Sequence, residues 1–246
     1  MSDLPSSLKD KNILITGSAR RLGRQLALSA ARAGANVLIH HAHSPAEAEQ
    51  TLHEVKAYGV EAHILVADLS DHVQVEGLIP QANSFGQLDA LINNAALFTP
   101  LSFFQTGYTD WQSELAVNLT APFLLSQAFA ASLQPDKKGR IVNILDWRAL
   151  RPGPDHFPYT ISKAALASMT QSLAISLAPR ITVNGLALGA ILPPSDGSTD
   201  NGLLRSVPAA RWATIEEVCQ SLLFLLSGPE YITGEILYVD GGRHLV

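Results

Sequence analysis

A regular alternation of short apolar runs with longer segments of helical period constrains the fold of this chain more than any other feature. A run that is apolar at nearly every position is typical of a strand buried on both faces, as in parallel sheets covered by helices. Right-handed crossovers then predict a single-domain, Rossmann-like α/β fold over residues 1–246, with a doubly wound parallel sheet and helices on both faces. The predicted strands, about seven, are 12–16, 36–40, 62–67, 90–93, 140–145, 181–186 and 236–240, and the predicted helices are 22–33, 45–58, 71–84, 109–132, 159–177 and 215–227.

Two segments interrupt this alternation, at 146–158 and at 189–208. The second is rich in Pro, Gly and Ser, and connections of this length often form lids or binding loops. We expect a flexible substrate loop over residues 189–208.

The balance of charged and apolar residues indicates which partners to expect. Charged residues make up 16% of the chain, below the roughly 25% usual in soluble domains, so we expect sister subunits to cover part of the surface. A net charge of −5 with scattered basic residues argues against a nucleic-acid partner. With no long apolar run, no signal-peptide pattern and a single cysteine, Cys219, we expect a cytoplasmic protein that makes no membrane contact.

The turn after the first strand reads "TGSARRLG", with Gly17 and Gly23 at its ends. Ligands of doubly wound sheets bind at the carboxyl ends of the strands, where glycines allow the backbone to approach a pyrophosphate. The position of this turn predicts a dinucleotide site.

The second strand ends in "IHHAHS", without the acidic residue that usually binds the adenosine ribose in NAD-dependent chains. Arg21 and Ser44 instead offer donors to a 2′-phosphate, which predicts NADPH. The alternative is that Arg21 is an ordinary solvated residue. A metal site built from the neighbouring histidines is disfavoured, because no acidic or cysteine ligand accompanies them. Asp68 either accepts a hydrogen bond from the adenine or caps the next helix.

Tyr159 and Lys163, in "YTISK", lie four residues apart and therefore on one face of a helix. A neighbouring ammonium is expected to lower the tyrosine pKa by about 1–3 units, to about 7–9, which suits acid–base catalysis.

Together with "ADLS", "NNAA", "VNGLALG" and "YITGEILYVDGG", these motifs resemble the short-chain dehydrogenase/reductase family along essentially the whole chain. The resemblance implies that Tyr159 donates a proton, that Lys163 binds the nicotinamide ribose and that Asn118 helps to hold a water linking the lysine to solvent. It also implies a homotetramer. The cofactor NADPH/NADP+ is expected to contact Gly17, Arg20, Arg21, Leu22, Gly23, His41, His43, Ser44, Asp68, Leu69, Asn94, Ala95, Tyr159, Lys163 and Gly189.

One departure from the family pattern concerns the substrate. The family's usual serine, thirteen residues before the tyrosine, is here Asp146, and an ionised carboxylate would repel a developing oxyanion. Asp146 therefore favours an imine or a basic nitrogen heterocycle, and the chain resembles the pteridine and dihydromonapterin reductase branch. Catalysis is assigned to Asp146, Tyr159, Lys163 and Asn118, and substrate binding to Phe98, Asp146, Trp147 and Tyr159; no metal is expected.

Other positions leave alternatives open. Phe98 either stacks a pterin ring against the nicotinamide or is an apolar plug beside the sheet. Ala96 replaces a serine that contacts the pterin, which weakens the pterin assignment. His43 replaces an arginine beside the 2′-phosphate, and Leu188 replaces a proline over the nicotinamide amide. Trp111 is expected to line the pocket, while Arg148 and Arg151 are equal candidates to point inward.

Three hypotheses follow. The first is NADPH-dependent reduction of a C=N bond in a dihydropterin-like substrate, with the proton supplied through Tyr159. The second keeps the fold and reduces a carbonyl, such as a 3-oxoacyl thioester or a sugar. The third is a cofactor-binding regulator without turnover, against which the complete set of Tyr159, Lys163 and Asn118 argues.

Overall fold

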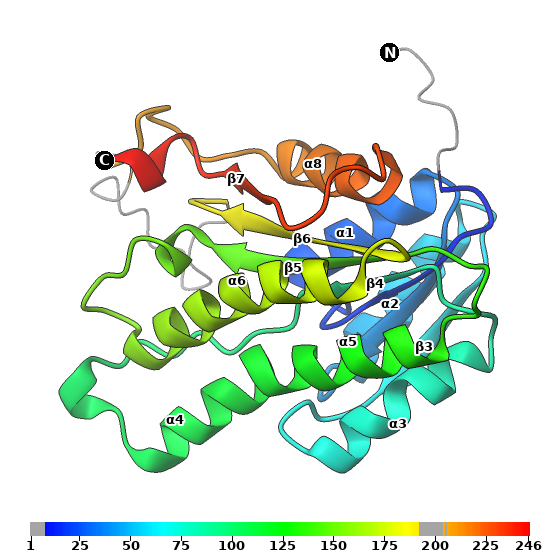
Figure 1. Ribbon diagram of the computed structural model, residues 1–246, viewed down its shortest axis with the longest axis horizontal. Coiled ribbons are helices and arrows are strands. Elements are labelled where there is room, and N and C mark those ends of the chain that lie inside the picture. The colour runs from blue at the N-terminus through cyan, green and yellow to red at the C-terminus, as the bar shows by residue number, and fades with distance from the viewer. Residues whose placement is uncertain (1–7, 192–203, 205) are drawn as a thin grey trace.

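Seven parallel strands form one sheet in the computed structural model, which describes residues 8–191, 204 and 206–246 (Figure 1). Most strand residues are apolar and buried, as expected for a sheet covered on both faces. They are β1 (Asn12–Ile15), β2 (Asn36–His41), β3 (Ala62–Val66), β4 (Ala90–Asn93), β5 (Gly139–Asp146), β6 (Ile181–Leu188) and β7 (Ile236–Val239).

The strand order is β3-β2-β1-β4-β5-β6-β7, so the direction of winding reverses between β1 and β4. At such a switch point the loops that leave the two strands diverge and open a crevice at their carboxyl ends. The predicted glycine turn follows β1 and the "NNAA" segment follows β4, so both flank this crevice.

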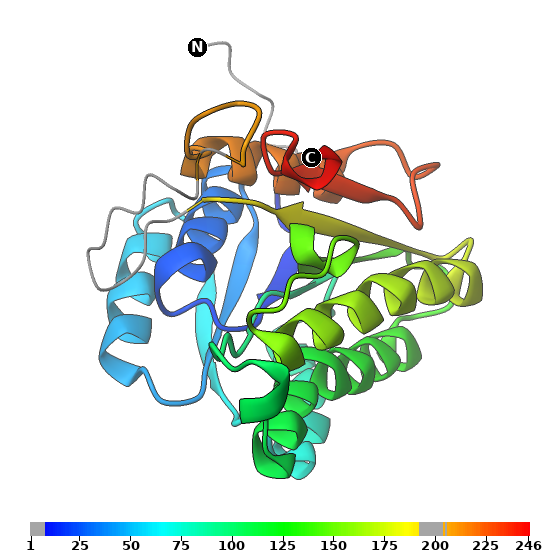
Figure 2. The same ribbon diagram turned by 90° about the vertical axis from the view of Figure 1, so that its left-hand side faces the viewer.

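Helices cover both faces of the sheet (Figure 2). The apolar stripes of α1, α2 and α8 pack into one core cluster, and those of α3, α5 and α6 pack into a second cluster on the opposite face. The helices are α1 (Arg21–Arg32), α2 (Pro45–Lys56), α3 (His72–Asn83), α4 (Tyr108–Leu115), α5 (Ala121–Ser132), α6 (Phe157–Leu177) and α8 (Ile215–Ser227).

The predicted Rossmann-like sheet is confirmed, and the predicted strands and helices agree with the structure to within about two residues at most ends. The helix predicted over 109–132 is confirmed in its bounds, and a π-helical turn (Ala116–Thr120) lies in its middle, between α4 and α5. Most of the predicted loop at 189–208 lies outside the described residues.

The continuous helical stretch Tyr108–Ser132 is long and apolar enough, by length and composition alone, to cross a membrane. Its inner face, however, packs against α3 and α6 within the domain and carries the buried polar side chains of Glu114 and Asn118. These contacts explain the apolar composition of the stretch as that of a helix packed within this α/β fold.

Candidate active site

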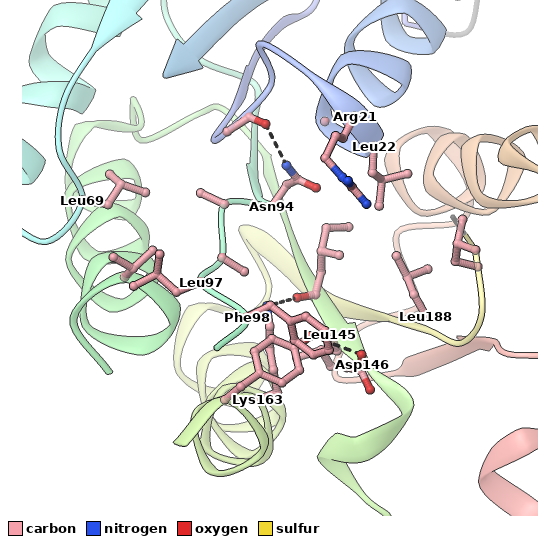
Figure 3. A pocket seen from close by; sticks show the side chains of 18 of the residues that line it. Arg21, Leu22, Leu69, Asn94, Leu97, Phe98, Leu145, Asp146, Lys163 and Leu188 are labelled. Carbon is pink, nitrogen blue, oxygen red and sulfur yellow. Dashed lines mark hydrogen bonds between the residues drawn. The ribbon is translucent and has the colours of Figure 1, made fainter. Parts of the chain in front are cut away.

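A cleft of about 1130 Å³ opens along the carboxyl ends of the strands. Figure 3 shows Arg21 and Asn94 toward one end, and Phe98, Asp146 and Lys163 gathered toward the other. The loops after β1, β2 and β3 form the first end, and the end of β5 with the start of α6 forms the second.

The turn after β1 is packed so tightly that Gly23 admits no side chain. A Cβ there would lie 2.2 Å from the carbonyl oxygen of Gly17 and 2.7 Å from Nδ2 of Asn94. Asn94 in turn donates from Nδ2 to the carbonyl of Thr16 at 2.8 Å, which ties the end of β4 to this turn. The exposed amino end of α1 is thereby fixed at the cleft, in the arrangement that cradles a pyrophosphate.

Arg21, the first residue of α1, stands in the left-handed region with a φ of +50°, where glycine would be at less cost. A non-glycine residue in this region carries about 1–2 kcal/mol of strain. Both Arg20 and Arg21 are exposed and line the cleft. The strained backbone of Arg21 thus places its guanidinium at the edge of the cleft, beside the glycine turn.

His40, on β2, supports the same turn through a hydrogen bond to its backbone. Its Nδ1 accepts a hydrogen bond from the backbone N–H of Gly17 at 3.0 Å, and its Nε2 lies 3.0 Å from the carbonyl of Ala67. Burial lowers the pKa of His40 to about 4, so the ring is neutral and donates to Ala67 from Nε2. This histidine joins β1, β2 and β3 and is not free to bind a ligand.

The loops after β2 and β3 close this end of the cleft. His41 and Ser44 are bonded to each other, since the Ser44 N–H donates to Nδ1 of His41 at 3.3 Å, and His43 is exposed with its Nε2 3.7 Å from Asp68. Hydrogen bonds from the N–H and hydroxyl of Ser70 lower the pKa of Asp68. Asp68 therefore holds the turn before α3, whereas the N-cap of that helix is Asp71.

At the other end, the Tyr159 hydroxyl donates to Oδ2 of Asp146 at 3.2 Å, while Oδ1 accepts from the backbone N–H of Arg148 at 2.8 Å. The Asp146 side chain lines the cleft from the last residue of β5. The two predicted catalytic groups are thus in direct contact.

The expected lowering of the tyrosine pKa is wrong for this structure. Burial, and next the adjacent Asp146 carboxylate, raise the pKa of Tyr159 well above its ordinary value. Burial likewise raises the pKa of Asp146, although its hydrogen bond from Arg148 opposes this. The phenol therefore holds its proton at neutral pH, as a proton donor must.

Lys163 is fully buried and donates from Nζ to the carbonyl of Ile144 at 2.7 Å. Its Nζ lies 5.8 Å from the centroid of the Tyr159 ring. Burial lowers the pKa of Lys163 to about 8, against the opposing charges of Asp146 and Glu114.

Asn118 lies behind the cleft wall, in the π-helical turn, and is fully buried. Its Oδ1 accepts from the N–H of Leu97 at 2.8 Å, and its Nδ2 donates to Oε2 of Glu114 at 2.8 Å and to the Ser162 hydroxyl at 3.1 Å. The extra residue of a π-turn directs this side chain inward, and such turns are frequent at functional sites. Glu114 was not predicted as a site residue; an acidic residue in an otherwise apolar helical stripe was its only signal.

Aromatic rings surround the open side of Tyr159. Phe98 packs edge-on against Tyr159, with ring centroids 4.6 Å apart, and stacks on His156 at 3.9 Å. Trp147 and Arg148 line the same end of the cleft. Trp111 does not, contrary to expectation, because its ring packs toward Phe157.

Of the predicted site residues, Asn118 and Trp111 are absent from the cleft lining. Arg148 lines the cleft and Arg151 does not, which resolves the open alternative. Sequence reasoning also missed several lining residues, among them the polar and aromatic side chains of Asp155, His156, Trp212 and Arg243. Within the described ranges no cluster of three or more histidine, cysteine or acidic side chains is arranged to hold a metal ion.

Comparisons with known proteins identify similar chains over nearly the full length. A family profile described as enoyl-(acyl carrier protein) reductase matches residues 17–244. The chain is 32% identical over 234 residues to a 3-oxoacyl-[acyl-carrier-protein] reductase from Synechocystis, covering 93% of this chain and 95% of that protein. It is 35% identical over 248 residues to the BbsD subunit of (2S)-[(R)-hydroxy(phenyl)methyl]succinyl-CoA dehydrogenase from Thauera aromatica, covering 97% and 98%.

A solved structure is similar over the same length. FolM alternative dihydrofolate reductase 1 from Brucella canis, complexed with NADP, matches with a TM-score of 0.89 and 34% identity. The match covers 96% of this chain and 95% of that one.

Proposed function

The chain belongs to the short-chain dehydrogenase/reductase family and uses NADP(H), and we propose that it reduces a C=N bond of a pterin-like substrate, taking a dihydropterin to its tetrahydro form. The observation that carries this proposal is the carboxylate of Asp146, which faces the cleft in contact with the tyrosine hydroxyl.

A carboxyl group in this position suits a nitrogen heterocycle better than a ketone. Next to a carbonyl, an ionised Asp146 would oppose the negative charge that develops on oxygen during reduction. Next to a ring nitrogen or an amino group, the same carboxylate accepts a hydrogen bond or shares a proton. Its raised pKa makes the protonated form more accessible near neutral pH.

The residues around the glycine turn fit NADP(H). The amino end of α1 and the closely packed Gly23 offer a pyrophosphate cradle, and Arg20 and Arg21 flank it where no acidic residue of β2 would repel a 2′-phosphate. When bound, the cofactor supplies the hydride.

The protein's own groups handle the proton. Tyr159 carries it on a phenol of raised pKa and delivers it to the substrate nitrogen. Asp146 holds the phenol by a hydrogen bond and orients the substrate through its second oxygen. Lys163, cationic below its pKa of about 8, lies behind the tyrosine ring and compensates the charge left when the proton has gone.

The relatives named as 3-oxoacyl reductases favour a second candidate, reduction of a carbonyl. The two are separated by following the loss of NADPH absorbance with 7,8-dihydropterins and with acetoacetyl thioesters, each repeated with NADH. Turnover of dihydropterins with NADPH supports the proposal. Turnover of thioesters alone contradicts it, and no turnover in the whole panel favours a non-catalytic regulator.

The variant Asp146→Ser tests the role of the carboxylate. We expect kcat/KM for the dihydropterin to fall by about 10²–10³-fold, the range for loss of a positioned catalytic group, with NADPH affinity unchanged. A carbonyl reductase would instead gain activity on the thioester. Undiminished dihydropterin reduction by this variant would remove the basis of the proposal.

A further inference from the structure

We propose that Arg243 binds an anionic group, a carboxylate or a phosphate, on the part of the substrate that extends away from the reacting bond. This inference rests on the proposed function for the identity of the substrate's ring, but the charge at Arg243 can be tested separately.

The cleft lining has more positive than negative side chains, although the whole chain has a negative net charge. The chain carries a net charge of −5, whereas the described residues that line the cleft include five basic and only three acidic side chains. Arg20 and Arg21 account for the basic charge at the phosphate end. Arg148 and Arg243 lie at the opposite end, with Asp146 and Trp147.

Arg148 is already engaged. Its Nη2 donates to Asp155 at 2.8 Å, its Nη1 lies 3.8 Å from Asp146, and its guanidinium lies over the Trp147 ring at 4.9 Å. We assign to it the positioning of the loop that follows β5.

Arg243 has no such partner. Its guanidinium lies 4.1 Å from the centroid of the Trp147 ring, and its buried Nε makes no hydrogen bond. Over residues 8–191, 204 and 206–246 it forms no ion pair. Burial, with Arg148 nearby, lowers the pKa of Arg243, as expected for a guanidinium that lacks a close carboxylate.

The turn that carries Arg243 is rigid. Asp240 accepts hydrogen bonds from the N–H of Gly242 at 2.9 Å and of His244 at 2.7 Å, and it pairs with the His244 ring at 2.7 Å. Gly242, with a φ of +84°, supplies the left-handed residue that this turn requires. Asp240 is therefore engaged in shaping the turn and forms no ion pair with Arg243.

Figures 1 and 2 both place the C-terminal turn beside the short helix that follows β5, so Arg243 approaches the cleft from a different element than Asp146. A guanidinium that lies over an indole ring, with a buried Nε that makes no hydrogen bond and no ion pair in the described residues, is suited to an anion. The chemical class that fits is a substrate with a carboxylate or phosphate on its arm.

Binding to the NADP+ complex provides the test, read from quenching of tryptophan fluorescence. Folate carries carboxylates on its arm, whereas the arm of biopterin is uncharged. Comparing the two ligands therefore measures the contribution of the carboxylates to binding. In Arg243→Gln we expect folate to bind about tenfold or more weakly, the effect of losing one charge-assisted contact, and biopterin to change by less than about twofold. Arg243→Lys should retain much of the folate affinity.

The matched control is Arg151→Gln, an exposed arginine of the same end that does not line the cleft; both ligands should bind as in the wild type. Equal loss of folate and biopterin in Arg243→Gln would mean general damage to the pocket and would overturn the inference. If Arg243→Gln does not fold, the comparison is made on the wild-type protein at low ionic strength. Folate that binds the wild type no more tightly than biopterin also overturns the inference.

A second ligand pair separates this inference from the proposed function. Acetoacetyl-coenzyme A carries phosphates, and the N-acetylcysteamine thioester of acetoacetate carries none. If Arg243→Gln weakens only the phosphate-bearing thioester, the anion site stands and the pterin substrate fails. If neither pair discriminates, the anion site fails whether or not dihydropterins are reduced.

Discussion

At the scale of single residues, Glu114 is a buried charge that, together with Asp146, opposes the effect of burial on the active-site lysine. Only 1% of Glu114 is exposed, and its carboxylate accepts hydrogen bonds from Asn118 and from the N–H of Thr99 at 2.9 Å. Its negative charge raises the pKa of Lys163 and so opposes the larger effect of burial, which brings that pKa to about 8. The carboxylate thus helps Lys163 to stay cationic at neutral pH.

The variant Glu114→Gln removes this charge at constant shape. Lys163 then loses its proton at lower pH. We therefore expect an alkaline limb of kcat/KM near pH 8 in the wild type and at lower pH in the variant. One broken hydrogen bond to Asn118 should also cost about 1–3 kcal/mol of folding free energy. The measurements are a pH–rate profile and urea unfolding.

Glu76→Gln, an exposed change on α3, is the control and should leave both quantities unchanged. A purely structural role for Glu114 would lower the stability of Glu114→Gln without moving the alkaline limb. That result would contradict the electrostatic role.

The residue whose chemistry was least predictable is Tyr159. Its four-residue spacing from Lys163 correctly places both on one helix face, but spacing says nothing of the tyrosine hydroxyl. That hydroxyl meets Asp146, thirteen residues earlier, because β5 ends against the start of α6. Contact with a carboxylate reverses the direction in which the pKa moves.

At the scale of elements, the turn between β1 and α1 depends on close packing. In Gly23→Ala the new Cβ would meet the Gly17 carbonyl at 2.2 Å, so the amino end of α1 must shift away from Asn94. We expect NADPH affinity to fall by about a hundredfold, and stability to fall by about 1–3 kcal/mol as for other overpacked sites. Calorimetric titration with NADPH and thermal unfolding measure the two effects.

The matched control is Gly77→Ala, within α3, where a Cβ would meet nothing within 4 Å. Alanine is the better helix former by about 1 kcal/mol, so this variant should be as stable as the wild type or more so, with normal NADPH affinity. Unchanged NADPH affinity in Gly23→Ala would show that this turn does not hold the cofactor.

Helices and strands could be predicted from the sequence where the spacing of apolar residues alone determines the type of element. The seven apolar runs became seven strands because a strand buried on both faces has no polar face to confuse the pattern. The π-helical turn at Ala116–Thr120 was not predictable, because it places Asn118 among partners from α6 and from the segment after β4 that are distant in sequence.

At the scale of the whole molecule, the position of the site follows from topology. The residues at the substrate end of the cleft, such as Arg243, do not follow from it. Parallel strands bring their carboxyl ends to one edge, so motifs 16–23, 40–44 and 93–96 had to meet there. Arg243 reaches the same cleft only through the turn after β7, and no local pattern marks it. A sequence therefore predicts the cofactor end of such a site better than the end that selects the substrate.

The sequence contains few charged residues, and apolar side chains are exposed on α5 and α6. These two helices lie side by side in Figures 1 and 2. Phe123 is 43% exposed, Ile161 37% and Ile175 83%. Large apolar side chains exposed on neighbouring helices are typical of an interface, and stable interfaces bury at least about 1,200 Å² in total.

We therefore expect a homotetramer of four 26.3 kDa chains, about 105 kDa by sedimentation equilibrium. The double variant Phe123→Glu/Ile175→Glu places charges in the buried interface, so it should sediment as a smaller species with an unchanged circular dichroism spectrum. Val73→Glu, at an exposed position on α3, should leave the mass unchanged. Wild-type protein that sediments as a monomer at micromolar concentration would contradict this expectation and leave the apolar face of α5 and α6 without an explanation.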